Sequence, residues 1–385
     1  MNKKNIAILG STGSIGENAL RVVDSALNEF NVVVLSANGI KLTRLKEQCE
    51  FYKPKYLLLE NHNAISEMQS EFSDITILHT SEGHDIIANE TELDVVVVGT
   101  VGIAGLKSVF ALAKATKIMA IANKEAILYG GDIMLQHLEK HNCKLIPVDS
   151  EHNSLYQLLR GVEISDVTKL IITASGGSFR NYSGDLSKVT VAQALSHPKW
   201  QMGHKNTIDS ANLINKGIEL IEAVILFKME PKKIQAIIHP QVIIHAMIEM
   251  ADNSVFAFLS NPDMSLHLAN AMRDNNKKIE TTPPIDFLKL GSLEFYEIDN
   301  KRFPGIKIAI NAVETSRSHV VAFNSADEIL VKAFIDEKIS FTQITDILDD
   351  ILNKITPQKL ESIEDIIDFD TEIKSITNKI IATNA

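Results

Sequence analysis

The feature that most constrains the fold is a series of short, almost wholly apolar runs within the first 150 residues. Segments with helical spacing, such as ENALRVVDSAL and KLTRLKEQCEFY, separate several of these runs. Near-continuous apolar strands that alternate with helices are typical of a parallel sheet covered on both faces. The sequence therefore predicts an α/β fold with a doubly wound parallel sheet in residues 1–149. The runs are IAIL (6–9), VVVLS (32–36), YLLLE (56–60), ITIL (75–78), DVVVVGT (94–100), IMAIA (118–122) and KLIPV (144–148).

After residue 149 the pattern of apolar and polar residues changes twice. Residues 150–275 contain three more apolar segments and most of the polar motifs, which predicts a central α+β catalytic domain. The segment RDNNKKIETTPP (273–284) is charged and ends in prolines, so a linker is expected over 276–302. In residues 303–385 the apolar residues recur at spacings of three and four, which predicts a C-terminal α-helical domain.

A glycine-rich segment, GSTGSIG (10–16), directly follows the first apolar run. Gly10 would allow a tight turn, Gly13 would let backbone N–H groups approach a pyrophosphate, and Gly16 would let a helix pack closely. This pattern favours a Rossmann-like dinucleotide-binding domain, although a glycine-rich turn without a ligand remains an alternative. The end of the second run, SANGIKL (36–42), lacks the acid that usually binds a ribose diol, which favours a 2′-phosphorylated cofactor.

The last strand of this series ends in VDSEH, with two carboxylates at Asp149 and Glu151. At the end of an extended segment, residues i and i+2 face the same side. Two such carboxylates repel each other unless a cation neutralises them, and Mg²⁺ or Mn²⁺ suits oxygen ligands. The alternative is that Asp149 merely ends a strand while Ser150 or Glu151 caps the next helix.

A third metal ligand is expected from IDSANLINKGIELIEAVILF (208–227). Its isoleucines follow helical spacing and predict a buried stripe. Asn215, Glu219 and Glu222 would share a neighbouring face, where Glu219 binds the cation while Asn215 and Lys216 donate to an anion. A solvated helix face is the alternative for these residues.

Three other segments carry candidate ligand-binding groups. In SGGSFR (175–180), Ser175 and the glycines could wrap an oxyanion. The segment SHPKWQMG (196–203) contains His197 and the only tryptophan, Trp200, which suggests a lid that covers substrate, although a core tryptophan is the alternative. The segment ANKEAI (122–127) lies at the carboxyl end of a predicted parallel strand, where α/β folds bind ligands.

Taken in order, GSTGSIG, ANKE, VDSEH, SGGSFR, HPKWQMG, IDSANLINKGIE and IHPQVIIH resemble the motifs of the 1-deoxy-D-xylulose 5-phosphate reductoisomerase family. The similarity extends from about Ile6 to Ile335. It implies an enzyme that uses NADPH and one Mg²⁺ or Mn²⁺ ion per chain. Such an enzyme would convert 1-deoxy-D-xylulose 5-phosphate to 2-C-methyl-D-erythritol 4-phosphate in the non-mevalonate isoprenoid pathway. The family also suggests a homodimer.

The resemblance assigns roles to residues at matching positions. The implied metal ligands are Asp149, Glu151 and Glu219, which together with Lys124 form the implied catalytic set. The implied substrate-binding residues are Lys124, Ser150, Glu151, Ser175, His197, Ser210, Asn215, Lys216 and Glu219. The implied cofactor-binding residues are Thr12, Gly13, Ser14, Ile15, Asn123, Glu125 and Gly203, with Asn38 as a neutral donor near the adenosine ribose.

One position departs from the family in a way that bears on the cofactor. Gly39 stands where the family commonly has Lys or Arg, so the usual cation for the 2′-phosphate is missing. Lys41 and Arg44 follow closely and are the candidate replacements. We therefore expect a preference for NADPH over NADH that is smaller than in relatives with the extra cation.

Charge and composition restrict the partners and the compartment. The formal charge of −11 disfavours sequence-independent binding to nucleic acid. Only two cysteines are present, Cys49 and Cys143, which suits a reducing cytoplasm. No apolar run approaches the roughly 18 residues of a membrane span. We expect a cytoplasmic protein that acts on a small sugar phosphate and has no nucleic-acid or membrane partner.

Two other functional classes remain open from the sequence. A metal-free NAD(P)-dependent dehydrogenase of the semialdehyde or homoserine type would explain the glycine-rich turn, but would leave the three carboxylates and the lid without a role. A non-catalytic nucleotide-sensing regulator would need a basic DNA-reading element, and the sequence shows none.

Overall fold

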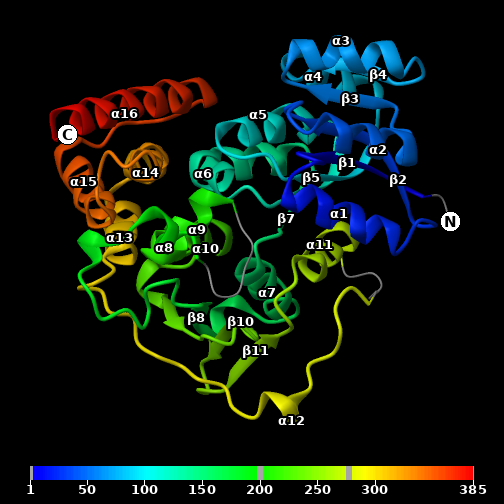
Figure 1. The fold of residues 1–385 in the computed structure, drawn as a ribbon. Coiled ribbons are helices and arrows are strands. Elements are labelled where there is room, and N and C mark those ends of the chain that lie inside the picture. The colour runs from blue at the N-terminus through cyan, green and yellow to red at the C-terminus, as the bar shows by residue number, and fades with distance from the viewer. Residues whose placement is uncertain (1–2, 197–202, 275–279, 385) are drawn as a thin grey trace. The chain divides into compact units, whose positions relative to one another are not determined.

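A computed structural model describes residues 3–196, 203–274 and 280–384 of the chain. The backbone forms two compact units (Figure 1). The first comprises Met1–Asn153 and Asp263–Pro283, and the second comprises Ser154–Pro262 and Pro284–Ala385. The predicted nucleotide domain, 1–149, therefore falls within the first unit, which also contains a segment from much later in the chain.

The first unit is built on a seven-stranded sheet in the order β4-β3-β2-β1-β5-β6-β7, and every neighbouring pair is parallel. The prediction of a doubly wound parallel sheet is confirmed, and each of the seven apolar runs forms one strand. The strand order reverses beside β1, which has β2 on one side and β5 on the other, and such a switch point is where open α/β sheets bind ligands. The strands are β1 Lys4–Leu9, β2 Phe30–Ala37, β3 Tyr56–Leu59, β4 Thr76–His79, β5 Leu93–Val98, β6 Thr116–Ile121 and β7 Lys144–Pro147.

Helices cover both faces of this sheet, as the apolar strands require. On one face α4, α5 and α6 pack against one another in succession, and α1 and α2 lie on the other face (Figure 1). The late segment contributes α11, which packs against α1 and β6. The helices of the first unit are α1 Ser14–Asp24, α2 Leu42–Tyr52, α3 His62–Glu71, α4 Thr80–Glu90, α5 Ile103–Leu112, the 3₁₀ turn η1 Ala113–Ala115, α6 Lys124–Lys140 and α11 Met264–Arg273.

The second unit has a four-stranded sheet in the order β11-β10-β8-β9. Strands β8 and β9 are parallel, whereas β10 runs antiparallel to both β8 and β11. The predicted α+β character of the central region is confirmed. The strands are β8 Val167–Ala174, β9 Ile234–Ile238, β10 Ile244–Met250 and β11 Val255–Leu259.

Helices make up most of the rest of the second unit, including the predicted helical C-terminal region. Helix α10 packs on α13, and α14 packs on both α15 and α16. Helix α7, Ser150–Leu158, contains the junction at which the chain passes from the first unit to the second. The other elements are η2 Ile164–Asp166, η3 Leu186–Lys188, α8 Val191–Ala194, α9 His204–Ala211, α10 Ile214–Phe227, η4 Pro231–Lys233, α12 Phe287–Leu290, α13 Gly305–Thr315, α14 Arg317–Ile335, α15 Phe341–Lys354 and α16 Ile363–Asn384. Among the described residues, no helix has the length and apolar character needed to cross a bilayer.

Candidate functional site

The glycine-rich turn joins β1 to α1 at the switch point of the sheet. Gly10 has a φ of +80°, and a Cβ there would lie 2.9 Å from the carbonyl oxygen of Gly99. A Cβ on Gly16 would lie 2.4 Å from the carbonyl oxygen of Gly10. A side chain at Gly10 would push the turn away from the loop after β5, and one at Gly16 would push α1 away from the turn. The N-cap residue Gly13 makes no side-chain cap bond to the first N–H groups of α1, which are the groups that bind anions at helix N-termini.

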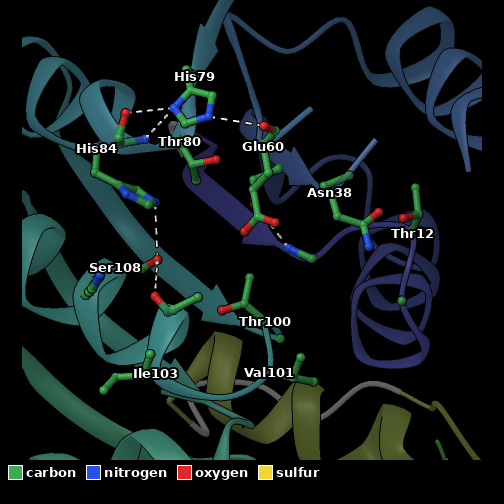
Figure 2. A pocket seen from close by; sticks show the side chains of 18 of the residues that line it. Thr12, Asn38, Glu60, His79, Thr80, His84, Thr100, Val101, Ile103 and Ser108 are labelled. Carbon is green, nitrogen blue, oxygen red and sulfur yellow. Dashed lines mark hydrogen bonds between the residues drawn. The ribbon is translucent and has the colours of Figure 1, made fainter. Parts of the chain in front are cut away.

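A cavity of about 870 Å³ opens over this turn, within the size range of ligand pockets. Its walls come from the loops that follow β1, β2, β3, β4 and β5, and from α4 and α5. Figure 2 shows Thr12 and Asn38 on one side and His84 and Ser108 on the other. Of the predicted cofactor residues, Thr12, Gly13 and Asn38 line the cavity, whereas Ser14 and Ile15 begin α1 just after it.

The polar atoms of the cavity fit a ligand rich in donors and acceptors. The hydroxyls of Thr80 and Thr100 are buried, line the cavity, and have no hydrogen-bond partner among the described residues. Buried polar atoms in native proteins are nearly always paired, so unpaired ones call for an explanation. A nucleotide cofactor bound in this cavity would supply the missing partners.

The loop after β2 decides which cation can reach a 2′-phosphate. Gly39 has a φ of +87°, and a Cβ there would lie 2.8 Å from the Cβ of Ala64, which explains why no Lys or Arg occupies this position. Lys41 lines the cavity and donates through Nζ to the carbonyl oxygen of Thr12 at 3.1 Å. Arg44, the other candidate, is instead held by Glu17 and Glu47 in contacts of 2.7–2.8 Å. Of these two candidates, Lys41 is therefore the one that lines the cavity.

Asn123 fixes the turn between β6 and α6. Its side-chain oxygen accepts from the backbone N–H of Ala126 at 2.7 Å, and its Nδ2 donates to the carbonyl oxygens of Thr100 and Gly102 at 2.6 and 2.9 Å. The residue is buried. Its amide thus caps α6 and holds the loop after β5 in place.

Replacing Asn123 by alanine is expected to lower the free energy of unfolding by about 2–4 kcal/mol, because three hydrogen bonds are lost and two partly buried carbonyls lose a donor. The measurement is urea-induced unfolding followed by circular dichroism. Asn89→Ala is the matched control, because the exposed Asn89 amide has one hydrogen bond, from Lys114. A loss no larger than the control's would show that the amide does not hold the turn.

The two acids after β7 lie close together as predicted, with carboxylate oxygens of Asp149 and Glu151 within 4.8 Å of each other, but the predicted reason does not hold. Strand β7 ends at Pro147 and α7 begins at Ser150, so the argument from strand alternation for Asp149 and Glu151 is wrong. Asp149 instead precedes the helix and accepts from the backbone N–H of Glu151 at 3.2 Å. Asp149, and not Ser150 or Glu151 as the alternative had it, therefore accepts from the first turn of α7.

Asp149 is also the centre of a charged cluster. Its carboxylate lies 2.7 Å from Nζ of Lys124 and 2.9 Å from Nδ1 of His152. Burial raises the pKa of Asp149, but the Lys124 ammonium and the His152 hydrogen bond outweigh it, so this pKa lies well below its usual range. The hydroxyl of Ser150 donates to the carboxylate of Glu151. The structure thus brings Lys124 to the predicted metal-binding acids and adds His152, to which the sequence analysis gave no role.

A second cluster forms on α10 in the second unit. Lys216 and Glu219 are 4% and 2% exposed, so the alternative of a solvated helix face is wrong. Lys216 donates to the Glu219 carboxylate and to the carbonyl oxygen of Thr173 at the end of β8. Asn215 donates to the other Glu219 oxygen at 2.6 Å. The three predicted residues of this helix therefore form one bonded group.

The loop after β8 lies against α9. The hydroxyl of Ser175 accepts from the backbone N–H of Gly177 at 3.2 Å. Gly177 has a φ of +68°, and a Cβ there would lie 2.3 Å from the carbonyl oxygen of Ser210. This close approach brings the loop that carries Ser175 next to Ser210.

Several predicted residues are not part of these clusters. His197 and Trp200, and with them most of the predicted lid, lie outside the described residues. Gly203 precedes α9 and is exposed, and Glu125 lies in the first turn of α6. The sequence analysis did not predict two parts of the cavity lining. These are the wall formed by α4 and α5, and Glu60, which directly follows β3. Their only signal in the sequence is that they follow predicted strands.

Comparisons with known proteins agree with this arrangement. Family models match residues 6–131 (1-deoxy-D-xylulose 5-phosphate reductoisomerase), 145–227 (the C-terminal domain of that enzyme) and 259–376 (DXP reductoisomerase C-terminal domain). The 1-deoxy-D-xylulose 5-phosphate reductoisomerase of Geotalea uraniireducens is 40% identical over 94% of this chain and 95% of its own. That of Microcystis aeruginosa is 40% identical over 98% of this chain and 99% of its own.

Solved structures of the same enzyme superpose over nearly the whole chain. The enzyme from Zymomonas mobilis in complex with NADPH has a TM-score of 0.92 at 30% identity, covering 99% of both chains. A DOX-P reductoisomerase in complex with NADPH, fosmidomycin and magnesium has a TM-score of 0.92 at 33% identity, covering 98% of both chains. The chain therefore belongs to the 1-deoxy-D-xylulose 5-phosphate reductoisomerase family.

Proposed function

We propose that this chain converts 1-deoxy-D-xylulose 5-phosphate to 2-C-methyl-D-erythritol 4-phosphate with NADPH and a divalent metal ion. The observation that carries the proposal is the cavity over the glycine-rich turn, in a chain whose relatives match it from end to end. A solved relative was captured with NADPH, fosmidomycin and magnesium together, and NADPH and a divalent ion are the two cofactors that this reaction needs. The reaction is a step of the non-mevalonate isoprenoid pathway.

The metal ion would be one Mg²⁺ or Mn²⁺ held by Asp149, Glu151 and Glu219. Carboxylate oxygens are the ligands that these ions prefer. Asp149 and Glu219 each form an ion pair with a lysine in the structure, so both carboxylates lie beside a positive charge. A divalent ion bound to them would add to that charge.

In the reaction, a carbon–carbon bond of the substrate is rearranged and the resulting aldehyde is reduced. The ion would polarise the substrate ketone as a Lewis acid and NADPH would supply the hydride. Lys124, held 2.7 Å from Asp149, can donate a proton or stabilise negative charge on a substrate oxygen. Ser150 and Glu151 lie beside it at the start of α7 and would contact the reacting end of the substrate.

The phosphate end of the substrate would be bound by groups in the second unit. These are a lysine, an asparagine amide and two hydroxyls, which suit a dianion. Binding the phosphate away from the reacting carbons orients the substrate and thereby raises the rate. The residues are Ser175, Ser210, Asn215 and Lys216, and His197 is proposed from the resemblance alone.

The cofactor would lie across the cavity, with its pyrophosphate on the turn. The proposed residues are Thr12, Gly13, Ser14, Ile15, Asn38, Asn123, Glu125 and Gly203. Lys41 is proposed as the cation for a 2′-phosphate, because a side chain at Gly39 would be strained and Arg44 is bound to two glutamates.

Replacing Lys41 by alanine is expected to weaken NADPH binding about 10- to 100-fold and to leave NADH binding unchanged, because one charge-assisted contact to the 2′-phosphate is lost. Titration calorimetry of each cofactor in wild type and variant measures this. Arg44→Ala is the control and should leave both affinities unchanged. A loss of NADPH preference in the Arg44 variant, or none in the Lys41 variant, would contradict the assignment.

The proposed reaction is tested by following NADPH oxidation with 1-deoxy-D-xylulose 5-phosphate, before and after exhaustive treatment with EDTA. Turnover that stops with EDTA and returns with Mg²⁺ or Mn²⁺ supports it. Full turnover of a semialdehyde or homoserine substrate without metal would support the dehydrogenase alternative instead, which the family match does not favour.

We also propose that the enzyme is a cytoplasmic homodimer. Both cysteines, Cys49 and Cys143, are buried and free, as suits a reducing compartment. Strand β11 lies at the edge of its sheet with Val255 and Phe256 half exposed, and an apolar edge strand invites pairing with a second chain. Light scattering on the purified protein tests the dimer, and a monomer at micromolar concentration would contradict it.

A further inference from the structure

The loop after β8, residues 175–182, is held by a side chain from much later in the chain. Arg302 lies in the connection just before α13. Its guanidinium donates through Nη2 to the carbonyl oxygen of Phe179 at 3.4 Å and also to that of Tyr182. The backbone N–H of Tyr182 donates to the Phe179 oxygen at 3.1 Å, so these two residues begin and end one turn. Arg302 therefore binds both ends of that turn.

The first half of this loop depends on such support. Gly176 and Gly177 have φ values of +90° and +68°, so two successive residues are in the left-handed region. Glycine loses more backbone freedom on folding than any other residue, so the pair is costly to order unless its neighbours are held. The neighbour that follows is held well, because the ring of Phe179 packs against Tyr182 and Phe341 with centroids 5.6 and 5.0 Å apart. Arg302 completes this anchor on the backbone side.

Arg302 is itself fixed in place. The carboxylate of Asp299 accepts from the backbone N–H groups of Lys301 at 3.0 Å and Arg302 at 3.2 Å. The carbonyl oxygen of Asp299 accepts from the N–H of Phe303 at 2.9 Å. The guanidinium lies 5.0 Å from the centre of the Phe303 ring, which is buried. Both the backbone and the head group of Arg302 are thus held, so it can serve as a rigid support.

The same segment also supports the other side of the proposed phosphate site. Gly305 begins α13, and a Cβ there would lie 2.9 Å from the backbone nitrogen of Ile214. A Cβ on Gly217 would lie 2.8 Å from the Cβ of Ala309. Helix α13 is therefore packed closely against the first turns of α10, the helix that carries Lys216. A short stretch of chain that begins at Arg302 thus contacts both the loop after β8 and α10.

We propose that Arg302 is a positioning residue for the substrate phosphate. It holds the loop after β8 beside α10, so that the hydroxyl of Ser175 meets the phosphate, and it acts through this loop rather than by contact with the substrate. The planar guanidinium suits the task, because its N–H groups point in fixed directions and can donate to two carbonyls at once. The inference rests on the proposed function, since Ser175 is proposed there as a phosphate ligand.

Replacing Arg302 by alanine is expected to raise KM for 1-deoxy-D-xylulose 5-phosphate about 10-fold, which corresponds to the loss of one hydrogen bond to the phosphate. The value of kcat should change less than about 3-fold, because the proposed metal ligands and Lys216 remain. Steady-state NADPH oxidation by the full chain with Mg²⁺ measures both. Lys301→Ala is the matched control, because its side chain is exposed on the same turn, and it should keep the wild-type KM.

A double substitution separates positioning from a general loss of structure. Ser175→Ala alone should also raise KM about 10-fold. If Arg302 acts through Ser175, the double variant should show an increase of no more than about 20-fold, because the hydroxyl that Arg302 places is already gone. Two independent effects would multiply to about 100-fold. NADPH affinity, measured by titration, should stay at the wild-type value in all variants, since the cofactor cavity belongs to the first unit.

Arg302→Lys guards against a folding defect in the alanine variant. Lysine keeps the charge and the stem but has a single nitrogen, so KM should rise only about 3-fold, with the same dependence on Ser175. A folded Arg302→Ala protein with the wild-type KM, or a double variant with the full 100-fold increase, would overturn the inference and leave the proposed function intact. A wild type that does not oxidise NADPH with this substrate would overturn the proposed function as well.

Discussion

Replacing Glu219 by glutamine is expected to lower kcat by about 10³-fold, because polarisation of a carbonyl by a metal ion contributes several kcal/mol to the rate. Glutamine keeps the shape of the side chain and its hydrogen bond to Asn215, but it removes the charge that would bind the ion. The affinity for NADPH should not change, since the cavity belongs to the first unit and Glu219 to the second. Turnover and NADPH titration together measure this.

The matched control is Glu222→Gln, the next acid on the same helix. Glu222 is buried like Glu219, so the two variants remove the same charge from similar surroundings. We expect the Glu222 variant to retain its affinity for Mn²⁺, measured by electron paramagnetic resonance, and the Glu219 variant to lose it. The opposite result would show that Glu222, not Glu219, is the metal ligand on α10.

Replacing Lys216 by methionine is expected to lower the free energy of unfolding by about 3–5 kcal/mol in the presence of EDTA, because it leaves the buried Glu219 carboxylate without its cation. Methionine keeps most of the apolar stem and removes the ammonium. Saturating Mg²⁺ should recover part of this loss, because the ion supplies the charge that Lys216 supplied. Urea unfolding with and without Mg²⁺ gives both values.

Lys232→Met provides the comparison at the surface. Lys232 also pairs with a glutamate, Glu230, but its side chain is 76% exposed, so the loss should stay below about 1 kcal/mol with or without Mg²⁺. Substrate affinity should fall only in the Lys216 variant, through the lost contact to the phosphate. An equal loss of stability with and without Mg²⁺ in the Lys216 variant would mean that the ion does not bind beside Glu219.

Local pattern was enough to predict the strands and the turn of the first unit. Each of the seven apolar runs became a strand because a strand buried on both faces needs apolar residues at successive positions. The glycines of GSTGSIG predicted the turn for two reasons. Gly10 adopts a positive φ, and Gly16 lies so close to the carbonyl oxygen of Gly10 that a Cβ would not fit. These features depend on residues that are close together in the chain, so they can be predicted from the sequence alone.

The tertiary structure decided which side chains serve the site. Lys41 and Arg44 looked equivalent in the sequence, but Glu17 and Glu47 hold Arg44, and only Lys41 faces the cavity.

The tertiary structure also decided the ion-pair partners of two lysines, Lys124 and Lys216. Lys124 and Lys216 were assigned to the substrate, and the structure shows each also neutralising a buried acid.

The wall with Thr80, His84 and Ser108 had no motif at all, because it forms only when α4 and α5 pack together. Hydrogen bonds and ion pairs depend on which groups meet across the fold, and that meeting is set by the packing of distant segments rather than by any local run of residues.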